Sequence, residues 1–185
     1  MQTQFNTEST AKSIENTALL VIDLQKDFLQ TSGKLPVDLA QVPQLIDTAN
    51  QAIQDFQANG KLVLHIINAF RKRDIGNLFR KFAAIEGSEG ASIDPRVQQE
   101  EIPCITKWKG DAFCNPLLLR TLRKNGITHL ILVGVYTDGC VKATAKSALQ
   151  NGFQVSILEK GVASRSLKAS QRGLKACQKM GAQVL

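Results

Sequence analysis

Short, unbroken apolar runs constrain the fold of this chain more than any other feature. Each run has the length of a β-strand and lacks the alternation of polar residues found in strands that face water on one side. Segments with helical periodicity separate the runs, so strands and helices alternate along the sequence. This order predicts an α/β protein, a three-layer α/β/α sandwich with a six-stranded, mainly parallel sheet. The expected strands cover residues 18–22, 61–67, 102–106, 130–135, 153–158 and 182–185.

Two of the helical segments carry clear end signals. Pro43 suits the first turn of a helix expected over residues 42–59, and Gly60 follows its last turn. Asn115 is a good N-cap for a second helix, which is expected to run through Lys124.

The length of the chain predicts one domain. A chain of 185 residues can bury a continuous core, and we expect the domain to span residues 18–185. Residues 1–17 are polar and are expected to form a short N-terminal arm. They lack the apolar segment of a signal peptide, and no stretch approaches the length of a membrane span. We therefore expect a cytoplasmic protein with no membrane partner.

The four cysteines, at positions 104, 114, 140 and 177, include no CxxC pair. This spacing disfavours a zinc site of paired cysteines and favours free thiols in a reducing compartment. Cys177 falls on the core face of a predicted helix, and Cys104 lies in or beside a predicted strand, so both are expected to be buried. For Cys114 burial is favoured over a place beside a pocket.

The formal net charge is +7, with local clusters at Arg71–Arg73 and Arg80-Lys81. A nucleic-acid-binding protein usually adds a recognisable reading motif to its basic surface, and this sequence has none. We therefore expect no nucleic-acid partner and read most of the charge as solvated surface. The clusters after the second strand leave a second interpretation open, which is attraction of an anionic substrate.

Residues 68–101 form the least regular part of the sequence. A segment of this length in a compact domain is often functional, and it could form a wall or lid over a site. Residues 77–84 have some helical character. Phe70, Phe79 and Phe82 are candidates for lining such a site, with burial in the core expected for at least one of them.

Cys140 lies between the apolar run 130–135 and a helical pattern that ends at Asn151-Gly152. At a strand-to-helix junction the N–H groups of the first turn are unpaired and the helix dipole is positive. Such a position favours thiolate, the nucleophilic form of cysteine. We predict that Cys140 is a catalytic nucleophile, with structural burial as the alternative.

Two charged residues can serve the thiol as partners. Asp23 follows a predicted buried strand and Lys107 follows a shorter predicted strand, at the sheet edge where open α/β sheets bind ligands. A nucleophilic thiol needs a base. The histidines are poorly placed, since His65 lies within a strand, as a hydrogen-bonded core residue, and His129 begins one. We predict Asp23 as the base and Lys107 as the balancing cation.

Alternatives remain for both of these residues. Asp23 could be a helix cap or a loop aspartate. Lys109 is a minor rival for the role of Lys107.

Three stretches then give a resemblance to a known family. They are LLVIDLQKDF (19–28), ITKWKGDAF (105–113) and GVYTDGCVKATAKSALQNGF (134–153). In this order and spacing the chain resembles the isochorismatase-like cysteine hydrolases over residues 18–184. That family includes nicotinamidases, N-carbamoylsarcosine amidohydrolases, maleamate amidases and ureidoacrylate amidohydrolases.

The resemblance implies a hydrolase that cleaves the C–N bond of a small amide or ureido compound through a thioester. It places the catalytic triad on Asp23, Lys107 and Cys140. It also implies a cis peptide between Val135 and Tyr136, with the backbone N–H groups of Tyr136 and Cys140 forming an oxyanion hole. Phe28 and Phe113 would contact the substrate. Family members are commonly dimers or tetramers, so a homodimer or homotetramer is expected.

Some positions depart from the family pattern. Gly110-Asp111 stands where the family usually has Tyr-Ser, and Lys160-Gly161 follows the fifth strand where an aspartate is common. The family's nicotinamidases bind a metal through an aspartate and histidines after the second strand, whereas residues 68–73 contain no histidine. We therefore expect no metal and no cofactor. Cys140 disfavours the vinyl-ether hydrolysis of members that lack this cysteine.

Two other classes of function stay open. One is a redox protein in which Cys140 is a peroxide-sensitive thiol, although no second cysteine lies near it in the sequence. The other is a binding module that uses the same fold without catalysis. The complete triad disfavours that reading.

Overall fold

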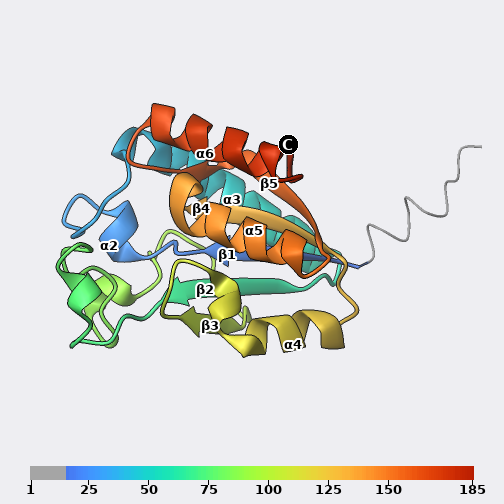
Figure 1. Ribbon diagram of the computed structural model, residues 1–185, viewed down its shortest axis with the longest axis horizontal. Coiled ribbons are helices and arrows are strands. Elements are labelled where there is room, and N and C mark those ends of the chain that lie inside the picture. The colour runs from blue at the N-terminus through green and yellow to red at the C-terminus, as the bar shows by residue number, and fades with distance from the viewer. Residues whose placement is uncertain (1–15) are drawn as a thin grey trace, which may run out of the picture.

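The computed structural model describes residues 16–185, so most of the arm predicted for residues 1–17 lies outside the described residues. Six strands form one sheet in the order β3-β2-β1-β4-β5-β6, and every pair of neighbours is parallel (Figure 1). The strands are β1 (Thr17–Ile22), β2 (Val63–Asn68), β3 (Cys104–Lys107), β4 (His129–Val135), β5 (Gln154–Ala163) and β6 (Gln183–Val184).

Helices cover both faces of the sheet. On one face α3 (Val42–Ala58) packs over β1 and β4, and on the other α4 (Pro116–Lys124), α5 (Lys142–Gln150) and α6 (Leu167–Lys179) enclose a second core (Figure 1). The predicted three-layer sandwich is therefore confirmed. None of the helices in residues 16–185 is long and apolar enough to cross a membrane.

Short elements complete the chain. The four-residue helix α2 (Lys26–Leu29) follows β1. Four 3-10 turns cover Leu39–Gln41, Ile75–Asn77, Glu89–Ala91 and Ala112–Cys114, and a π-type turn at Thr137–Val141 leads into α5. Two predicted helix ends are confirmed. Gly60 follows α3 with a φ of 62°, and Asn115 caps α4 by accepting a hydrogen bond from the Leu117 N–H.

The central strands β1 and β4 approach each other closely near their carboxyl ends. Ile22 pairs there with Gly134. A Cβ at Gly134 would lie 2.0 Å from the Ile22 carbonyl oxygen, and its φ of +129° is one that side-chain-bearing residues rarely adopt. Only glycine fits, so this residue allows the segments after the two strands to lie side by side.

Two of the predicted elements differ from the structure. The strand expected to end at residue 158 continues to Ala163, because the chain bulges at the solvent-exposed pair Glu159-Lys160 and then rejoins β4 in a shifted register. The helical character expected over residues 77–84 is wrong, since this stretch forms turns in which Lys81, Phe82 and Ala84 all have positive φ.

Candidate active site

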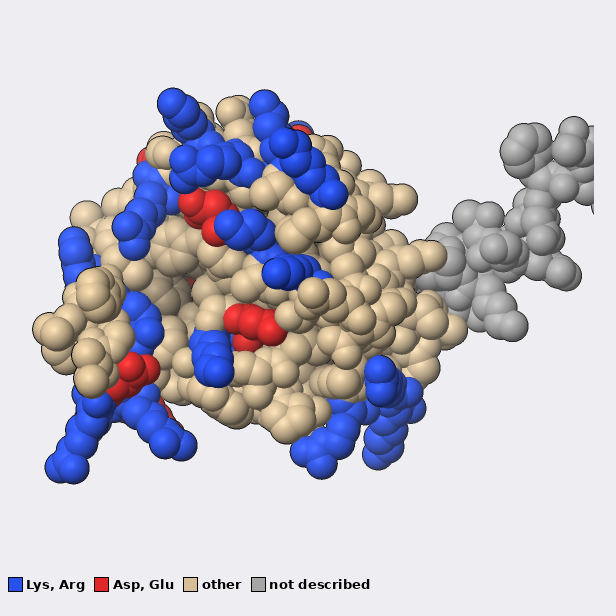
Figure 2. Space-filling view, viewed as in Figure 1, with Lys and Arg blue, Asp and Glu red and all other residues tan. Residues whose placement is uncertain are grey.

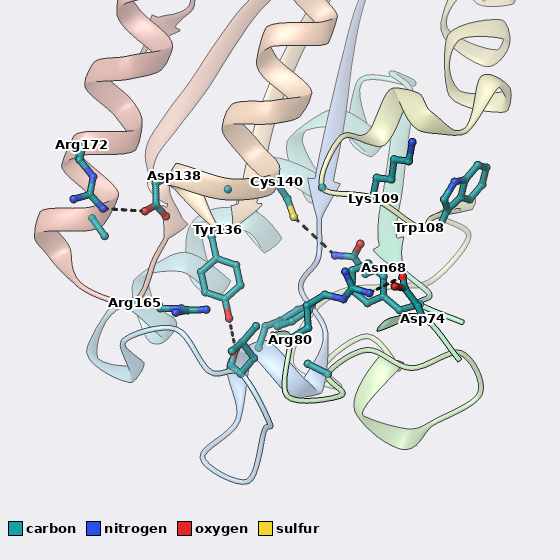
Figure 3. Close-up of a pocket in the computed structure, with 17 residues that line it drawn as sticks. Asn68, Asp74, Arg80, Trp108, Lys109, Tyr136, Asp138, Cys140, Arg165 and Arg172 are labelled. Atoms are coloured by element: carbon teal, nitrogen blue, oxygen red, sulfur yellow. Dashed lines mark hydrogen bonds and ion pairs between the residues drawn. The ribbon is translucent and has the colours of Figure 1, made fainter. Parts of the chain in front are cut away.

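A pocket of about 870 Å³ opens at the carboxyl ends of the central strands. Its walls come from α2, the loop after β2, the loop after β3, the turn before α5 and the start of α6 (Figure 3). The sulfur of Cys140 points into this pocket. In a parallel sheet, side chains at the ends of neighbouring strands gather at one edge, which is why residues distant in sequence meet here.

The predicted base and cation form a buried ion pair. Lys107 Nζ lies 2.9 Å from Asp23 Oδ2, and the two side chains are 0% and 1% exposed. Lys107 Nζ also donates to the Lys109 carbonyl at 3.1 Å. The Lys109 side chain itself lines the pocket. Lys107 is therefore the lysine paired with Asp23, and Lys109 is not.

The backbone of Asp23 directs its side chain toward this pair. Its φ is 56°, in the left-handed region, which aspartate tolerates better than most residues. Its N–H donates to the Ile66 carbonyl at 2.8 Å, so the residue is still tied to β2. The short helix α2 has Gln25 as its N-cap. Asp23 is thus not a helix cap, which removes that alternative.

Asn68, at the end of β2, lies between these charged groups. Its Nδ2 donates to Asp23 Oδ2 at 2.8 Å, and its Oδ1 accepts from Lys107 Nζ at 2.8 Å. Its Nδ2 also lies 3.9 Å from Cys140 Sγ (Figure 3). Asn68 was not among the predicted site residues, since in the sequence it belongs to a stretch notable only for its lack of histidine. The available signal was its place at a strand end, the same signal that identified Asp23 and Lys107.

Burial governs the protonation of the site. It raises the pKa of the Cys140 thiol to about 12, and the charge of Asp23 acts in the same direction. Although a place before a helix favours thiolate, burial beside a carboxylate acts against it at Cys140, so the resting thiol holds its proton. Burial also raises the pKa of Asp23, although Lys107 opposes this. Burial lowers the pKa of Lys107, but the charges of Asp23 and Cys140 outweigh it and the net shift is upward.

One oxygen of Asp23 remains available. Oδ2 receives both Lys107 and Asn68, whereas Oδ1 is buried and accepts no hydrogen bond from the described residues. The Cys140 thiol is near enough for the carboxylate to raise the pKa of the thiol, while the thiol in turn lowers the pKa of the carboxyl group. This arrangement leaves a carboxylate oxygen ready to take the thiol proton.

The turn that carries Cys140 has an irregular backbone and packs closely against α6. The peptide between Val135 and Tyr136 is cis, and Gly139 within the turn has non-helical dihedrals, φ −118° and ψ −107°. On the other side, α6 approaches so closely that a Cβ at Gly173 would lie 2.6 Å from the Asp138 backbone nitrogen. α5 begins only at Lys142, so Cys140 precedes the first turn of that helix.

Side chains of α6 also bind this turn. Thr137 Oγ1 and Ser170 Oγ lie 2.8 Å apart and are both buried. Arg172 pairs with Asp138 at 3.3 Å, and the same aspartate accepts from the Ser164 hydroxyl. The position of the thiol therefore depends on the C-terminal helix as well as on the sheet.

The predicted aromatic contacts divide into two groups. Phe28 lines the pocket, with its ring edge-on to Tyr136 at 5.8 Å between centroids. The structure places Phe113 elsewhere, with its ring centroid 6.0 Å from that of Phe153 against the second core. The prediction of Phe113 as a substrate contact is corrected on this ground, because the 3-10 turn at Ala112–Cys114 directs its ring away from the pocket.

The loop after β2 supplies part of the pocket wall. This is one of the two roles predicted for residues 68–101, the other being a lid. Phe70 is buried and lines the pocket, while Phe79 and Phe82 are exposed and do not line it. Trp108, which sequence reasoning did not select, lines the pocket next to Lys109 (Figure 3). Gly110 lies beside the thiol, since a Cβ there would have Cys140 Sγ as its nearest neighbour at 3.9 Å.

The pair Gly110-Asp111 departs from the family pattern. Asp111, its second residue, has a structural role. It accepts from the Phe113 N–H at 2.9 Å and from the Ser147 hydroxyl at 2.7 Å. It therefore ties the loop after β3 to α5.

Basic side chains surround the pocket. Arg80, Lys109, Arg165 and Arg172 line it, against the acidic residues Asp74 and Asp138. Figure 2 shows Lys and Arg side chains around a hollow on this face. Asp74 pairs with Arg80 at 2.7 Å and Asp138 with Arg172. Arg165 forms no ion pair within residues 16–185 and stands over the Tyr136 ring.

The remaining cysteines differ from one another. All four are free thiols. Cys177 is buried in the core, as predicted. The prediction for Cys104 is wrong, because β3 is an edge strand and leaves this residue exposed. Cys114 is half-buried and is not among the residues that line the pocket.

The donor set around the pocket does not fit a zinc ion, which prefers cysteine, histidine and carboxylate ligands. Among residues 16–185, no three His, Cys, Asp or Glu side chains gather as a metal site would require. His65 is buried in β2 with its Nε2 2.9 Å from the Gln98 carbonyl, the core position predicted for it. His129 begins β4, so it lies at the amino ends of the strands, away from the pocket at their carboxyl ends.

A parallel sheet with a thiol, a carboxylate and an ammonium group gathered in a pocket at its carboxyl edge defines an α/β enzyme of the hydrolase class. The chain belongs to the isochorismatase family, because it matches the family described as "Isochorismatase domain" over residues 17–185. The predicted family is thereby confirmed.

Known relatives are similar to this chain over most of its length, and a solved structure shares its fold. The chain is 29% identical to the nicotinamidase of Escherichia coli, with 78% of this chain and 81% of the relative covered. It is 27% identical to the ureidoacrylate amidohydrolase RutB of Klebsiella pneumoniae, covering 79% and 71%. The crystal structure of the pyrazinamidase of Pyrococcus horikoshii in complex with zinc superposes with a TM-score of 0.83 at 27% identity, covering 92% and 98%.

Proposed function

We propose that this protein hydrolyses a C–N bond of a small amide or ureido compound, with Cys140 as nucleophile. One observation carries the proposal. Asp23 Oδ1 accepts no hydrogen bond from residues 16–185, while Lys107 and Asn68 both donate to Oδ2, and the thiol of Cys140 is the neighbouring acid. The names of the relatives, which include a nicotinamidase and a ureidoacrylate amidohydrolase, support the same class of reaction.

In the first step, Asp23 takes the proton of the Cys140 thiol as sulfur attacks the carbonyl carbon of the substrate. A raised carboxylate pKa helps this transfer, because a base works best when its pKa is near the working pH. Lys107 stays protonated and balances the negative charge of the site. A tetrahedral intermediate forms, with a new C–S bond and an oxyanion.

In the second step, the intermediate expels ammonia or an amine, which leaves with the proton held by Asp23. The product on the enzyme is a thioester of Cys140. Asp23 then takes a proton from water, whose oxygen attacks the thioester carbonyl, and the carboxylic or carbamic acid leaves as the thiol recovers its proton. No step in this scheme uses a metal.

The oxyanion is proposed to bind the backbone N–H groups of Tyr136 and Cys140. Both residues border the pocket, and the cis peptide before Tyr136 lies in the turn that carries Cys140. One donor of this kind contributes about 3–4 kcal/mol of transition-state stabilisation in other enzymes. The ring of Phe28 is proposed to form one apolar side of the substrate site.

The substrate is proposed to carry a carboxylate or another anionic group. Arg165 supports this, because it lines the pocket and has no acidic partner within residues 16–185. A guanidinium group binds a carboxylate in a two-point geometry that a neutral amide cannot reproduce. The basic clusters after β2 contribute only Arg80 to the pocket, and Arg80 is already paired with Asp74.

A panel of amides and ureido acids tests the function through ammonia release. Wild type is expected to act on at least one compound and Cys140→Ala on none. Hydroxylamine should trap the acyl group as a hydroxamate with wild type only. If wild type releases nothing from the panel while Cys140 forms a stable sulfenic acid with peroxide, the redox interpretation replaces this one. If wild type binds a compound from the panel without hydrolysing it, the interpretation as a non-catalytic binding module replaces the proposed function.

The same panel tests the anionic group. Carboxylate-bearing amides are expected to be preferred over neutral analogues, and Arg165→Gln should remove that preference mainly through KM. A preference for neutral amides in wild type would contradict the assignment. Homodimer or homotetramer formation and a cytoplasmic location are further proposals, to be checked by light scattering and by fractionation of cells.

A further inference from the structure

We propose that Asn68 is a fourth functional residue, which holds Asp23 and Lys107 in place and donates a hydrogen bond to Cys140 Sγ as negative charge develops there. The proposal rests on the function assigned to Cys140 above. Asn68 is 2% exposed, and its side-chain amide contacts all three predicted catalytic groups. Each of these contacts has a distinct consequence.

The orientation of the amide is fixed by its partners. Its oxygen faces the ammonium group of Lys107 and its nitrogen faces the carboxylate of Asp23. A flipped amide would place N–H groups against a cation and oxygen against an anion, which is unfavourable on both sides. The asparagine can therefore occupy only one of its two orientations.

This orientation assigns the two oxygens of Asp23 to different tasks. The N–H of Asn68 and the ammonium group of Lys107 converge on Oδ2. Oδ1 then remains without a hydrogen-bond donor in the described part of the chain, and it is the oxygen left to accept the thiol proton. Without Asn68 the carboxylate would lose a restraint on its rotation.

The second amide hydrogen is directed toward sulfur. Asn68 Nδ2 lies 3.9 Å from Cys140 Sγ, within reach of a hydrogen bond to sulfur. A donor at this place favours thiolate over thiol, since it binds the charged form more strongly. It opposes the burial that keeps the resting thiol protonated.

The backbone of Asn68 is held independently of the site. The Gln25 side chain accepts from the Asn68 N–H at 2.9 Å and donates to the Asn68 carbonyl at 2.8 Å. The same Gln25 nitrogen donates to the Ala91 carbonyl at 2.6 Å. A functional side chain supported in this way is preorganised, because its position does not depend on the substrate.

The test is the pH dependence of Cys140 alkylation by iodoacetamide, followed by mass spectrometry of the peptide that contains Cys140. It uses the full chain and needs no substrate. Asn68→Ala is expected to move the profile to higher pH and to slow alkylation at neutral pH about tenfold, which is what a shift of one pKa unit gives. Asn68→Asp, which keeps the size of the side chain, should move the profile further, because it adds a negative charge and removes both donors.

A buried asparagine outside the site provides the matched control. Asn77 is 0% exposed and donates to the Arg71 and Lys72 carbonyls. Asn77→Ala should lower the melting temperature and leave the alkylation profile of Cys140 at its wild-type position. If the Asn68→Ala protein does not fold, Asn68→Asp carries the test alone.

The outcomes separate this proposal from the proposed function. With an amide that wild type hydrolyses, Asn68→Ala should lower kcat and leave KM within about twofold. If the Asn68 variants fold and keep the wild-type alkylation profile, Asn68 is only structural and the proposal fails, whatever the enzyme hydrolyses. If the profile shifts while no amide is hydrolysed, the function fails and the control of the thiol by Asn68 stands.

Discussion

Lys107 Nζ lies 2.9 Å from Asp23 Oδ2, with both side chains withdrawn from solvent. Lys107 ends β3 and Asp23 directly follows β1, and β2 with its terminal Asn68 lies between these strands in the sheet. The order of the strands therefore places an amide between a cation and an anion. A buried ion pair contributes little net stability when intact, yet it is costly to break on one side only.

Replacement of one partner should expose this asymmetry. Lys107→Met leaves Asp23 buried without its cation, so the carboxyl holds a proton at neutral pH and no longer acts as a base. We expect turnover to fall by about 10²–10⁴-fold and the free energy of unfolding to fall by about 3–5 kcal/mol. Denaturant titration and the ammonia assay measure the two effects. Wild-type kcat in this variant would refute the role given to Lys107.

The double variant Asp23→Asn, Lys107→Met is the control for the single variant Lys107→Met. It removes both charges, so much of the lost stability should return while activity stays absent. A double variant as unstable as the sum of two single variants would show that the ion pair is not the source of the loss.

Gly134 should tolerate no side chain. Gly134→Ala combines a φ of +129° with a Cβ placed 2.0 Å from the Ile22 carbonyl oxygen. We expect a loss of more than about 3 kcal/mol, as in other severe core clashes. Gly152→Ala is the matched control, since its φ is +87° but nothing lies within 4 Å of the added methyl group. It should cost about 1 kcal/mol. Equal losses by denaturant titration would contradict the close approach of β1 and β4.

Gly110 should control the size of the acyl group that reaches Cys140. A side chain here enters the space next to the sulfur, where Gly110 now leaves room. For Gly110→Leu we expect kcat/KM to fall about tenfold or more for bulky amides and much less for the smallest ones. Stability should change by about 0.5 kcal/mol or less, because the position is exposed. A uniform loss over all amides would mean that the residue does not select by size.

His65 should make stability depend on pH. Burial lowers its pKa below the ordinary value of 6.5, so the unfolded chain binds a proton more readily than the folded one. Its contribution is fully present above the unfolded pKa and is lost as the pH falls. The slope approaches about 1.4 kcal/mol per pH unit at most. Unfolding free energies at about pH 7.5 and 5.5 measure it, and His65→Gln should reduce the difference; an unchanged difference would exclude His65 as a source.

Strand ends allowed much of this site to be predicted. Asp23 and Cys140 follow buried apolar strands and Lys107 ends a shorter edge strand, and a parallel sheet brings such positions to one edge. Asn68 follows the same rule, but an asparagine has no charge or nucleophilic atom to mark it. Its role depends on what it touches, and contacts across three strands are not encoded in any one segment.

Other differences have local causes. Phe113 belongs to a stretch with a strong family resemblance, yet one 3-10 turn decides which way its ring faces. The thiolate expectation considered only the position of Cys140 along the chain. Desolvation is a property of everything packed around the sulfur, and here it outweighs the favourable position.

The contacts between α6 and the turn at Thr137–Val141 have a consequence for folding during synthesis, which proceeds from the N-terminus. Gly173 and Ser170 touch this turn, and both leave the ribosome after every residue of the proposed catalytic group. A nascent chain that ends before Ser170 carries Cys140 but lacks the support that fixes its position. The site is therefore completed late in synthesis, when the helix that follows β5 reaches the turn.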